Sequence, residues 1–241
     1  MSTSRARSDE PRPVDMNSTP NIFVLCGPSG CGKSTLIGRL MSEFPGRFGF
    51  SVSHTTREPR VGEINGVNYN FSDPAKMQAD VDAGLFLEHA IVHGNHYGTS
   101  FAAIDLVVGN GKICILDIDV QGVSTVKRSP EIDQSKVVFV MLVPPSLAEL
   151  EKRLRGRSTD SEEVIVKRLA RARDEMEYRD RKDFWDLILV NDEIDACYCT
   201  LKNLVESKFR LVHDLSPKGS NVLGTLSARK PVHPAYLEAD E

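Results

Sequence analysis

The sequence is poor in long apolar runs and in excess charge of one sign. No stretch approaches the roughly 18 consecutive apolar residues that span a bilayer, so we expect no membrane association. Thirty Lys and Arg residues face 34 Asp and Glu residues, for a formal net charge of −4. Because a dedicated nucleic-acid binder carries a basic surface, nucleic acid is not an expected partner. A polyanionic ligand would therefore need a local cluster of positive charge.

Cysteine is also scarce, and its five residues form neither a Cys-x-x-Cys pair nor a zinc-ligand spacing. The first twenty residues contain no apolar stretch of the kind that forms a signal peptide. An odd number of cysteines without such a signal is typical of a reduced intracellular protein. We therefore expect a cytoplasmic protein in which residues 1–19 form a disordered extension.

The 241 residues are enough for one large domain, and their pattern predicts its class. Four continuous apolar runs have the length of buried strands: 22–26, 113–116, 137–143 and 187–190. Helical spacing of apolar residues follows in three segments: about 147–156, 161–176 and 194–210. This alternation predicts an α/β fold with a doubly wound, mostly parallel sheet. Beyond residue 210 the composition predicts a C-terminal tail, 211–241.

A glycine-rich segment directly follows the first predicted strand. It has the form G-x-x-x-x-G-K-[ST] and comprises Gly27, Pro28, Ser29, Gly30, Cys31, Gly32, Lys33 and Ser34. Such a loop wraps phosphates with its N–H groups, while the Lys reaches the outer phosphates and the hydroxyl binds Mg²⁺. We count Thr35 with the same ATP-binding set. An incidental glycine-rich turn is the alternative, and the motif alone leaves a GTPase, an ATPase motor or a small-molecule kinase open.

A second segment with possible phosphate chemistry follows at Ser53-His-Thr-Thr-Arg57-Glu-Pro-Arg60. Two guanidinium groups three residues apart suit a phosphate, because each can donate two hydrogen bonds. A solvated basic turn is the alternative. Residues from Phe50 to His93 also have short segments and a turn at Asn65-Gly66, which predicts a small mixed or antiparallel lobe.

The complete run GFSVSHTTREPR…GEINGVNYNF resembles the substrate-binding segment of guanylate kinases. The resemblance continues in FLEH, GNHYGT, ILDIDVQG and RLRGR, and covers about residues 20–210. It implies a P-loop NTPase-type core (20–49 and 98–210), a mixed α+β GMP-binding insert (about 50–97) and a helical lid (about 153–170).

The resemblance also implies a role for individual side chains. Four would hold the GMP phosphate: Arg57, Arg60, Tyr69 and Tyr97. Glu88 would accept hydrogen bonds from guanine N1–H and the amino group, and Ser53 and Thr99 would contact O6. The remaining assignments are Asp119 near the amino group, Asp117 near Mg²⁺, Gly122 in the substrate site and Asn191 near adenine. Without the motif, Glu88 would be read as a surface charge.

The segment 149–183 holds 11 basic and 10 acidic residues, which by themselves indicate solvated helix faces. The resemblance assigns Arg153, Arg157 and Arg168 to catalysis, together with Lys33. Arg171 and Arg173 have a weaker claim, and we expect them to be surface charges.

Together these features predict a kinase that transfers the γ-phosphoryl group of ATP to GMP, and to dGMP, with Mg²⁺. We expect a monomer or weak dimer. The alternatives are a non-catalytic guanylate-kinase-like interaction module and a kinase for another nucleoside monophosphate.

Overall fold

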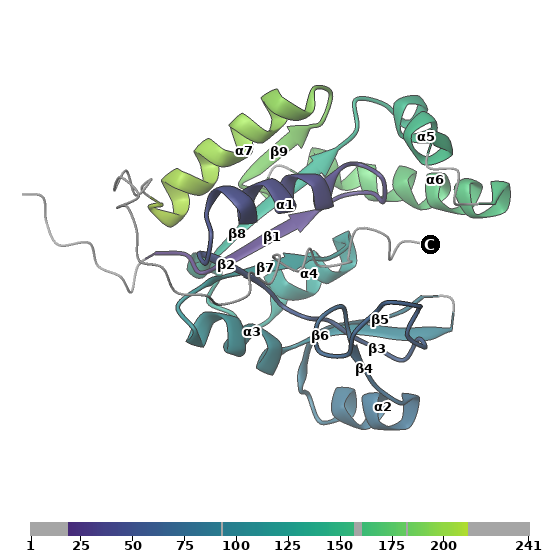
Figure 1. Ribbon diagram of the computed structural model, residues 1–241, viewed down its shortest axis with the longest axis vertical. Helices are drawn as coiled ribbons and strands as arrows, with labels where there is room; N and C mark the ends of the chain where they lie inside the picture. The colour runs from purple at the N-terminus through teal and green to yellow at the C-terminus, as the bar shows by residue number, and fades with distance from the viewer. Residues whose placement is uncertain (1–18, 93, 157–160, 182, 212–241) are drawn as a thin grey trace, which may run out of the picture.

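A computed structural model describes residues 19–92, 94–156, 161–181 and 183–211. Its large sheet has five parallel strands in the order β2 (Phe48–Phe50), β7 (Ile113–Asp117), β1 (Ile22–Cys26), β8 (Val137–Val143) and β9 (Leu187–Val190) (Figure 1). All four apolar runs form strands of this sheet, so the prediction of a doubly wound parallel sheet is confirmed.

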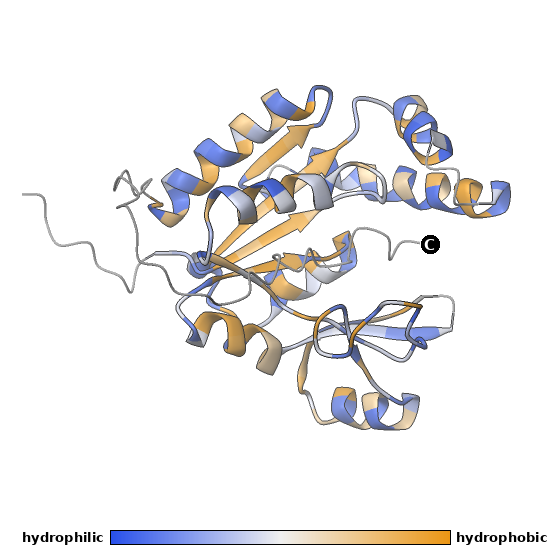
Figure 2. Ribbon diagram, viewed as in Figure 1, coloured by the Kyte–Doolittle hydropathy of each residue, from blue (hydrophilic) through white to orange (hydrophobic). Residues whose placement is uncertain are grey.

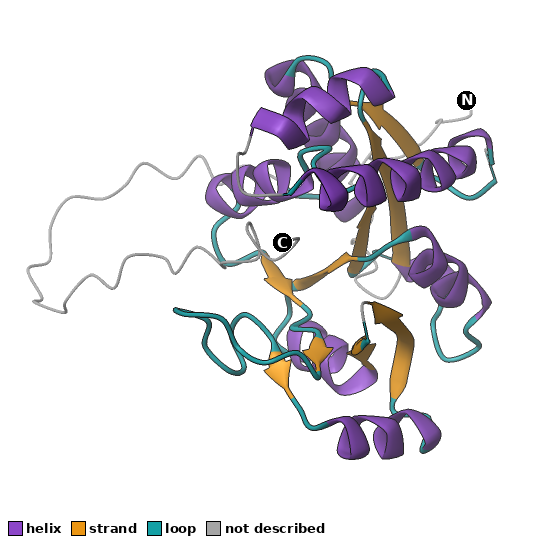
Figure 3. Cartoon of the chain, turned by 90° about the vertical axis from the view of Figure 1, so that its right-hand side faces the viewer, coloured by secondary structure: helices purple, strands orange, loops and turns teal. Residues whose placement is uncertain are grey.

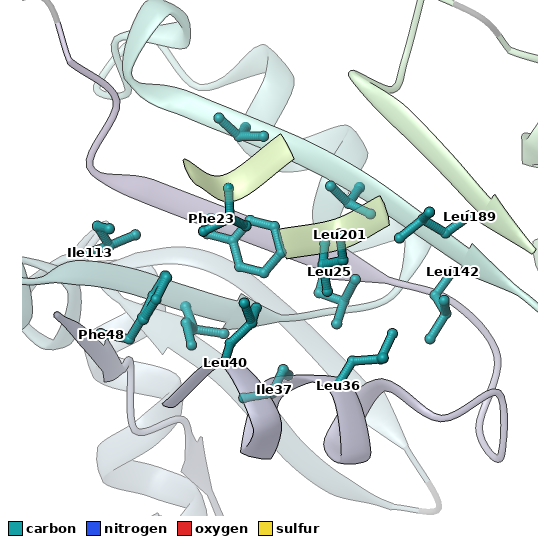
Figure 4. Packing of buried hydrophobic residues seen from close by; sticks show 14 of the residues in the cluster. Phe23, Leu25, Leu36, Ile37, Leu40, Phe48, Ile113, Leu142, Leu189 and Leu201 are labelled. Carbon is teal, nitrogen blue, oxygen red and sulfur yellow. The ribbon is translucent and has the colours of Figure 1, made fainter. Parts of the chain in front are cut away.

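Helices cover both faces of the large sheet. One face packs against α1 (Lys33–Glu43) and α7 (Ile194–Phe209), and the other against α3 (Phe101–Gly109) and α4 (Val120–Arg128). Side chains of β1 alternate accordingly, with Phe23 and Leu25 facing α1 and α7 (Figure 4). These strands are almost entirely apolar, as Figure 2 shows, because both of their faces are buried. Asp117, the last residue of β7, is their one charged residue.

The inserted lobe contains a second sheet of four short strands. Its order is β4 (Asn70–Phe71), β3 (His54–Thr55), β6 (Asn95–Ser100) and β5 (Phe86–Val92). The β3–β4 pair is parallel and the other two pairs are antiparallel, so the lobe is mixed. Helix α2 (Pro74–Asp82) begins after Asp73, whose carboxylate accepts a hydrogen bond from the Lys76 N–H at 2.8 Å. In both Figure 1 and Figure 3, α2 and α7 lie at opposite ends of the molecule.

Two further helices, α5 (Leu147–Gly156) and α6 (Glu162–Met176), pack against each other through Leu150, Leu154, Ile165 and Ala172. Short 3₁₀ segments at Gln134–Lys136 and Glu177–Asp180 complete the described elements. No helix in the described part of the chain is long and apolar enough to cross a membrane.

Several details differ from the sequence prediction. Helices α3 and α4 were not predicted, and β6 extends to Ser100, three residues beyond the expected end of the insert at 97. The expected extensions, 1–19 and 211–241, lie outside the described residues except for Thr19 and Leu211. Leu211, which we assigned to the tail, is buried in the core beside α7.

Candidate active site

The glycine-rich loop joins β1 to α1 and is held tightly against neighbouring strands. Gly27 has a φ of +149°, and a Cβ atom there would lie 2.0 Å from the carbonyl oxygen of Leu142. Gly32, the N-cap of α1, has a φ of +103°, and a Cβ atom would lie 2.4 Å from the Asn191 side-chain nitrogen. Both positions therefore require glycine. The loop ends at the N-terminus of α1, where backbone N–H groups can bind an anion.

Lys33 lies over this loop at the first position of α1. Its Nζ donates to the carbonyl oxygen of Gly27 at 2.6 Å and is 3.7 Å from a carboxylate oxygen of Asp117, at the end of β7. Ser34 follows in the first helical turn and is half-buried, whereas Thr35 is exposed. Parallel strands β1 and β7 are neighbours, so their carboxyl ends bring the amine and the carboxylate together.

Asn191 and Cys31 support the loop from inside the protein. The buried amide of Asn191 donates to the carbonyl oxygen of Cys31 at 2.8 Å, so this side chain fixes the loop. The Cys31 thiol is fully buried, and burial raises its pKa to about 11. The thiol is therefore protonated at neutral pH and unreactive.

Helix α6 brings one of the expected arginines to the loop. Arg168 Nη1 donates to Ser29 Oγ at 3.1 Å, across 139 positions of sequence. Arg153 lies on α5, where its Nε donates to Glu149 at 3.1 Å. Arg157 lies outside the described residues. Thus Arg168 joins Lys33 at the phosphate loop.

The two arginines of the insert share a carboxylate that the sequence analysis missed. Arg57 forms an ion pair with Glu63 at 2.7 Å, and the Arg60 N–H donates to the other oxygen of Glu63, also at 2.7 Å. The Arg57 guanidinium lies 5.4 Å from the ring centroid of Tyr69. The available signal was a carboxylate three residues after Arg60 and six after Arg57, close enough along the chain to reach both.

Aromatic and carboxyl side chains of the second sheet continue this surface. The rings of Tyr69 and Tyr97 lie 6.1 Å apart. Glu88 pairs with Thr99 across β5 and β6. Burial raises the pKa of Glu88 to about 7, hydrogen bonds from Thr99 oppose this rise, and the charge of Asp119 adds to it. Ser53 lies on the same lobe, where its carbonyl oxygen accepts from the Asn70 N–H at 2.8 Å.

Asp119 is the N-cap of α4 and links the large sheet to α6. One carboxylate oxygen accepts from the N–H of Gly122 at 2.8 Å, and the other accepts from Arg171 Nη2 at 2.7 Å. Gly122 is buried, and a Cβ atom there would lie 3.1 Å from Ile118. Arg171 is exposed, as expected of a surface charge, and it also bonds to a residue of the candidate site. The two charged residues are 52 positions apart, so the sequence gave no signal for this contact.

A phosphate loop between a buried parallel strand and a helix, with Lys33 over the loop, defines a P-loop nucleotide-binding protein. The family model described as guanylate kinase matches residues 19–208, and the chain belongs to the guanylate kinase family. This confirms the resemblance inferred from the motifs.

Individual relatives agree with this assignment. The chain is 52% identical to guanylate kinase 1 of Oryza sativa subsp. japonica over 183 residues, which are 76% of this chain and 47% of the relative. It is 46% identical to human guanylate kinase over 193 residues, 80% of this chain and 96% of the relative. The chain thus spans about half the length of the rice relative and nearly all of the human one. A crystal structure of guanylate kinase from Anaplasma phagocytophilum is similar, with 28% identity and a TM-score of 0.57 over 79% of this chain and 86% of that one.

Proposed function

We propose that the protein transfers the γ-phosphoryl group of ATP to GMP, giving ADP and GDP, and that it also accepts dGMP. The observation that carries the proposal is the presence of two separate cationic sites. Lys33 and Arg168 lie at the phosphate loop, and Arg57 and Arg60 lie on the inserted lobe. One site suits a nucleoside triphosphate and the other an acceptor monophosphate.

The acceptor site is suited to guanine. When ionised, Glu88 can accept hydrogen bonds from guanine N1–H and the 2-amino group together, with Ser53 and Thr99 directed to O6. Adenine has an acceptor at N1, which would leave the carboxylate facing a lone pair. A site of this kind rejects the wrong base strongly, because its polar group stays unpaired. We assign the GMP phosphate to Arg57, Arg60, Tyr69 and Tyr97.

The donor site acts by positioning and electrostatics. The N–H groups of residues 27–32 and the start of α1 would hold the ATP phosphates. Lys33 and Arg168, with Arg153 and Arg157 on the lid, would stabilise the charge that spreads over the transferring group. No general base is needed, because the attacking phosphate oxygen is already ionised. Asn191 would keep the loop in place beside the adenine.

The residues expected to bind Mg²⁺ fit this ion. Ser34 is half-buried at the loop and Asp117 is partly exposed beside Lys33, and hydroxyl and carboxylate oxygens are the hard ligands that Mg²⁺ prefers. When bound with ATP, the ion would neutralise phosphate charge. The proposal also includes small-molecule substrates in the cytoplasm and a monomer or weak dimer, which sedimentation of the purified chain would test.

The decisive experiment measures ADP formed from ATP with each nucleoside monophosphate. We expect GMP to be preferred over AMP, CMP and UMP by at least about 100-fold in kcat/KM. Equal rates with all four would contradict the acceptor assignment. ATP binding without ADP formation from any of them would favour a non-catalytic interaction module.

Lys33→Met provides the companion test of the loop. Turnover should fall by about 100-fold or more, because the variant loses a charge at the transferring phosphoryl group. The exposed Lys112→Met is the matched control and should retain wild-type turnover. Normal activity of Lys33→Met would overturn the role of the phosphate loop.

A further inference from the structure

A chain of three charged side chains connects α6 to the start of α4. Arg171 Nε donates to Glu175 Oε1 at 3.0 Å, and Arg171 Nη2 donates to Asp119 Oδ2 at 2.7 Å. The Glu175 side chain is only 8% exposed, whereas that of Arg171 is 50% exposed. The buried carboxylate therefore anchors the guanidinium, which in turn reaches across to another element.

Asp119 is consequently held from two sides. Oδ1 accepts from the Gly122 N–H at 2.8 Å and Oδ2 accepts from Arg171. A carboxylate oxygen can accept two hydrogen bonds, so each oxygen keeps capacity for a ligand donor. Asp119 is also close enough to Glu88 for its charge to raise the pKa of that carboxyl group. Helix α4, which Asp119 caps, contacts β5, the strand that carries Glu88, so the two carboxyl groups belong to the same part of the site.

We propose that Arg171 is a positioning residue for base recognition: it holds Asp119 so that the carboxylate receives the 2-amino group of the purine, and Glu175 holds Arg171. This inference rests on the proposed GMP kinase function. In this role Arg171 acts through Asp119 and not by touching the base. Arg171 fixes the direction of the lone pairs of Asp119. Its charge-assisted hydrogen bond holds the carboxylate more firmly than the backbone N–H of Gly122 would alone.

The same helix carries Arg168 to the phosphate loop. Arg168 and Arg171 are three residues apart, about one helical turn, and bond to Ser29 and Asp119 respectively. A single rigid element therefore aligns the carboxylate at the base with the loop at the phosphates. Loss of Arg171 should loosen the carboxylate of Asp119 and leave the contact between Arg168 and the phosphate loop intact.

The test compares GMP with inosine monophosphate, which has the O6 and N1–H of GMP but lacks the 2-amino group. In Arg171→Gln, the KM for GMP should rise about tenfold, while the KM for inosine monophosphate and kcat for both should stay within about twofold. Gln keeps a donor for the buried Glu175, so this variant should fold; Arg171→Lys should recover much of the GMP affinity. Urea unfolding and direct GMP binding complete the measurement.

Matched variants make the outcome clear. Arg173→Ala, an exposed arginine on the same helix, should behave as wild type with both substrates. Adding Arg171→Gln to Asp119→Asn should produce no further loss, because both changes remove the same interaction. Equal losses for GMP and inosine monophosphate, or no loss in Arg171→Gln, would overturn the inference. If the wild type failed to phosphorylate GMP at all, the proposed function itself would be wrong.

Discussion

At the scale of single residues, the surroundings of Glu88 bear on its proposed role in binding guanine. The carboxyl group is largely removed from water beside Thr99 and near Asp119, so its pKa rises to about 7. In the free protein it is therefore only partly ionised at neutral pH. A ligand with two adjacent N–H donors would bind the ionised form and complete its ionisation.

We predict that kcat/KM for GMP falls as the pH is lowered through about 7, because protonated Glu88 loses its capacity to accept both guanine donors. The measurement is a pH profile of kcat/KM from about pH 5.5 to about pH 8.5. Glu88→Gln should remove this midpoint and leave only the titration of the substrate phosphate. An unchanged midpoint in that variant would assign the titration to another group.

The same shift has a consequence for stability. The folded state holds the Glu88 proton up to about pH 7, whereas the unfolded state releases it near its usual value of 4.5. Stability from this group is present below pH 4.5 and is lost as the pH rises through 7. The Gln side chain of Glu88→Gln does not titrate. In urea unfolding, the free energy of unfolding of this variant should therefore rise relative to that of the wild type as the pH increases from about 4.5 to above about 7, by at most about 3 kcal/mol. A constant difference across that range would contradict the shift.

Gly32 offers a second prediction at this scale. Gly32→Ala would place a Cβ atom 2.4 Å from Asn191 at a positive φ, so the loop must move. We expect a loss of about 1–3 kcal/mol in unfolding free energy and a loss of ATP binding by calorimetry. Gly109→Ala is the matched control, because a Cβ atom there meets nothing within 4 Å. Retained ATP binding in Gly32→Ala would show that the loop tolerates a side chain.

At the scale of elements, α6 is the part that unites the site. It begins at a Ser161 cap, packs on α5 through Ile165 and Ala172, and presents Arg168 to the phosphate loop. Its apolar face fixes the helix, and its polar face supplies the charges. The helix is therefore both a packed element and a carrier of site residues.

For this helix we predict that Arg168→Ala lowers kcat by about 100-fold or more, because positive charge at the transferring phosphoryl group acts mainly in the transition state. The free energy of unfolding should change by less than about 1 kcal/mol, since the side chain is only half-buried. Steady-state kinetics and urea unfolding measure the two effects. A change in KM for ATP without a change in kcat would instead indicate ground-state binding alone.

The elements also show what the sequence could and could not predict. Apolar runs and periodicity predicted the central strands and the helices α5, α6 and α7. The central strands are buried on both faces, and each of these helices has one buried apolar face. Helix α3 was missed because FAAIDLVVG is apolar nearly all round, and α4 because it begins within the ILDIDVQG motif. Strands β3 and β4 have only two residues each, too few for any period.

The candidate site divides in the same way. The phosphate loop was predicted from local spacing, because consecutive residues form it. Glu63 and Arg171 were missed, since their significance depends on partners that only folding brings close. Roles of individual side chains toward GMP came from family resemblance alone and stay predictions.

At the scale of the whole molecule, charge is distributed unevenly. The chain has a net charge of −4, yet Lys33, Arg168, Arg57 and Arg60 gather at two places. The phosphate loop belongs to the large sheet, and the arginine pair belongs to the inserted lobe. In the proposed function, GMP contacts both parts of the fold, through Glu88 on the lobe and Asp119 at the start of α4, so its binding should stabilise the native state.

We accordingly predict a selective thermal shift. GMP at about 100 times its Kd should add about 2.7 kcal/mol to the free energy of unfolding and raise Tm by roughly 5–10 °C. AMP at the same concentration should leave Tm within about 1 °C, because it would bind far more weakly. Scanning calorimetry measures both, and equal shifts would point to recognition of the phosphate alone.

The connection between the two sheets has a consequence for engineering. The chain leaves the large sheet after Phe50 and begins α3 at Phe101, so the second sheet is one uninterrupted stretch between two elements of the core. The residues on that stretch that we propose to contact the acceptor could be exchanged together, as a cassette, without cutting the strands that carry the phosphate loop. Asp119 and Arg171 lie outside it, so a graft for another base would need those two positions redesigned as well.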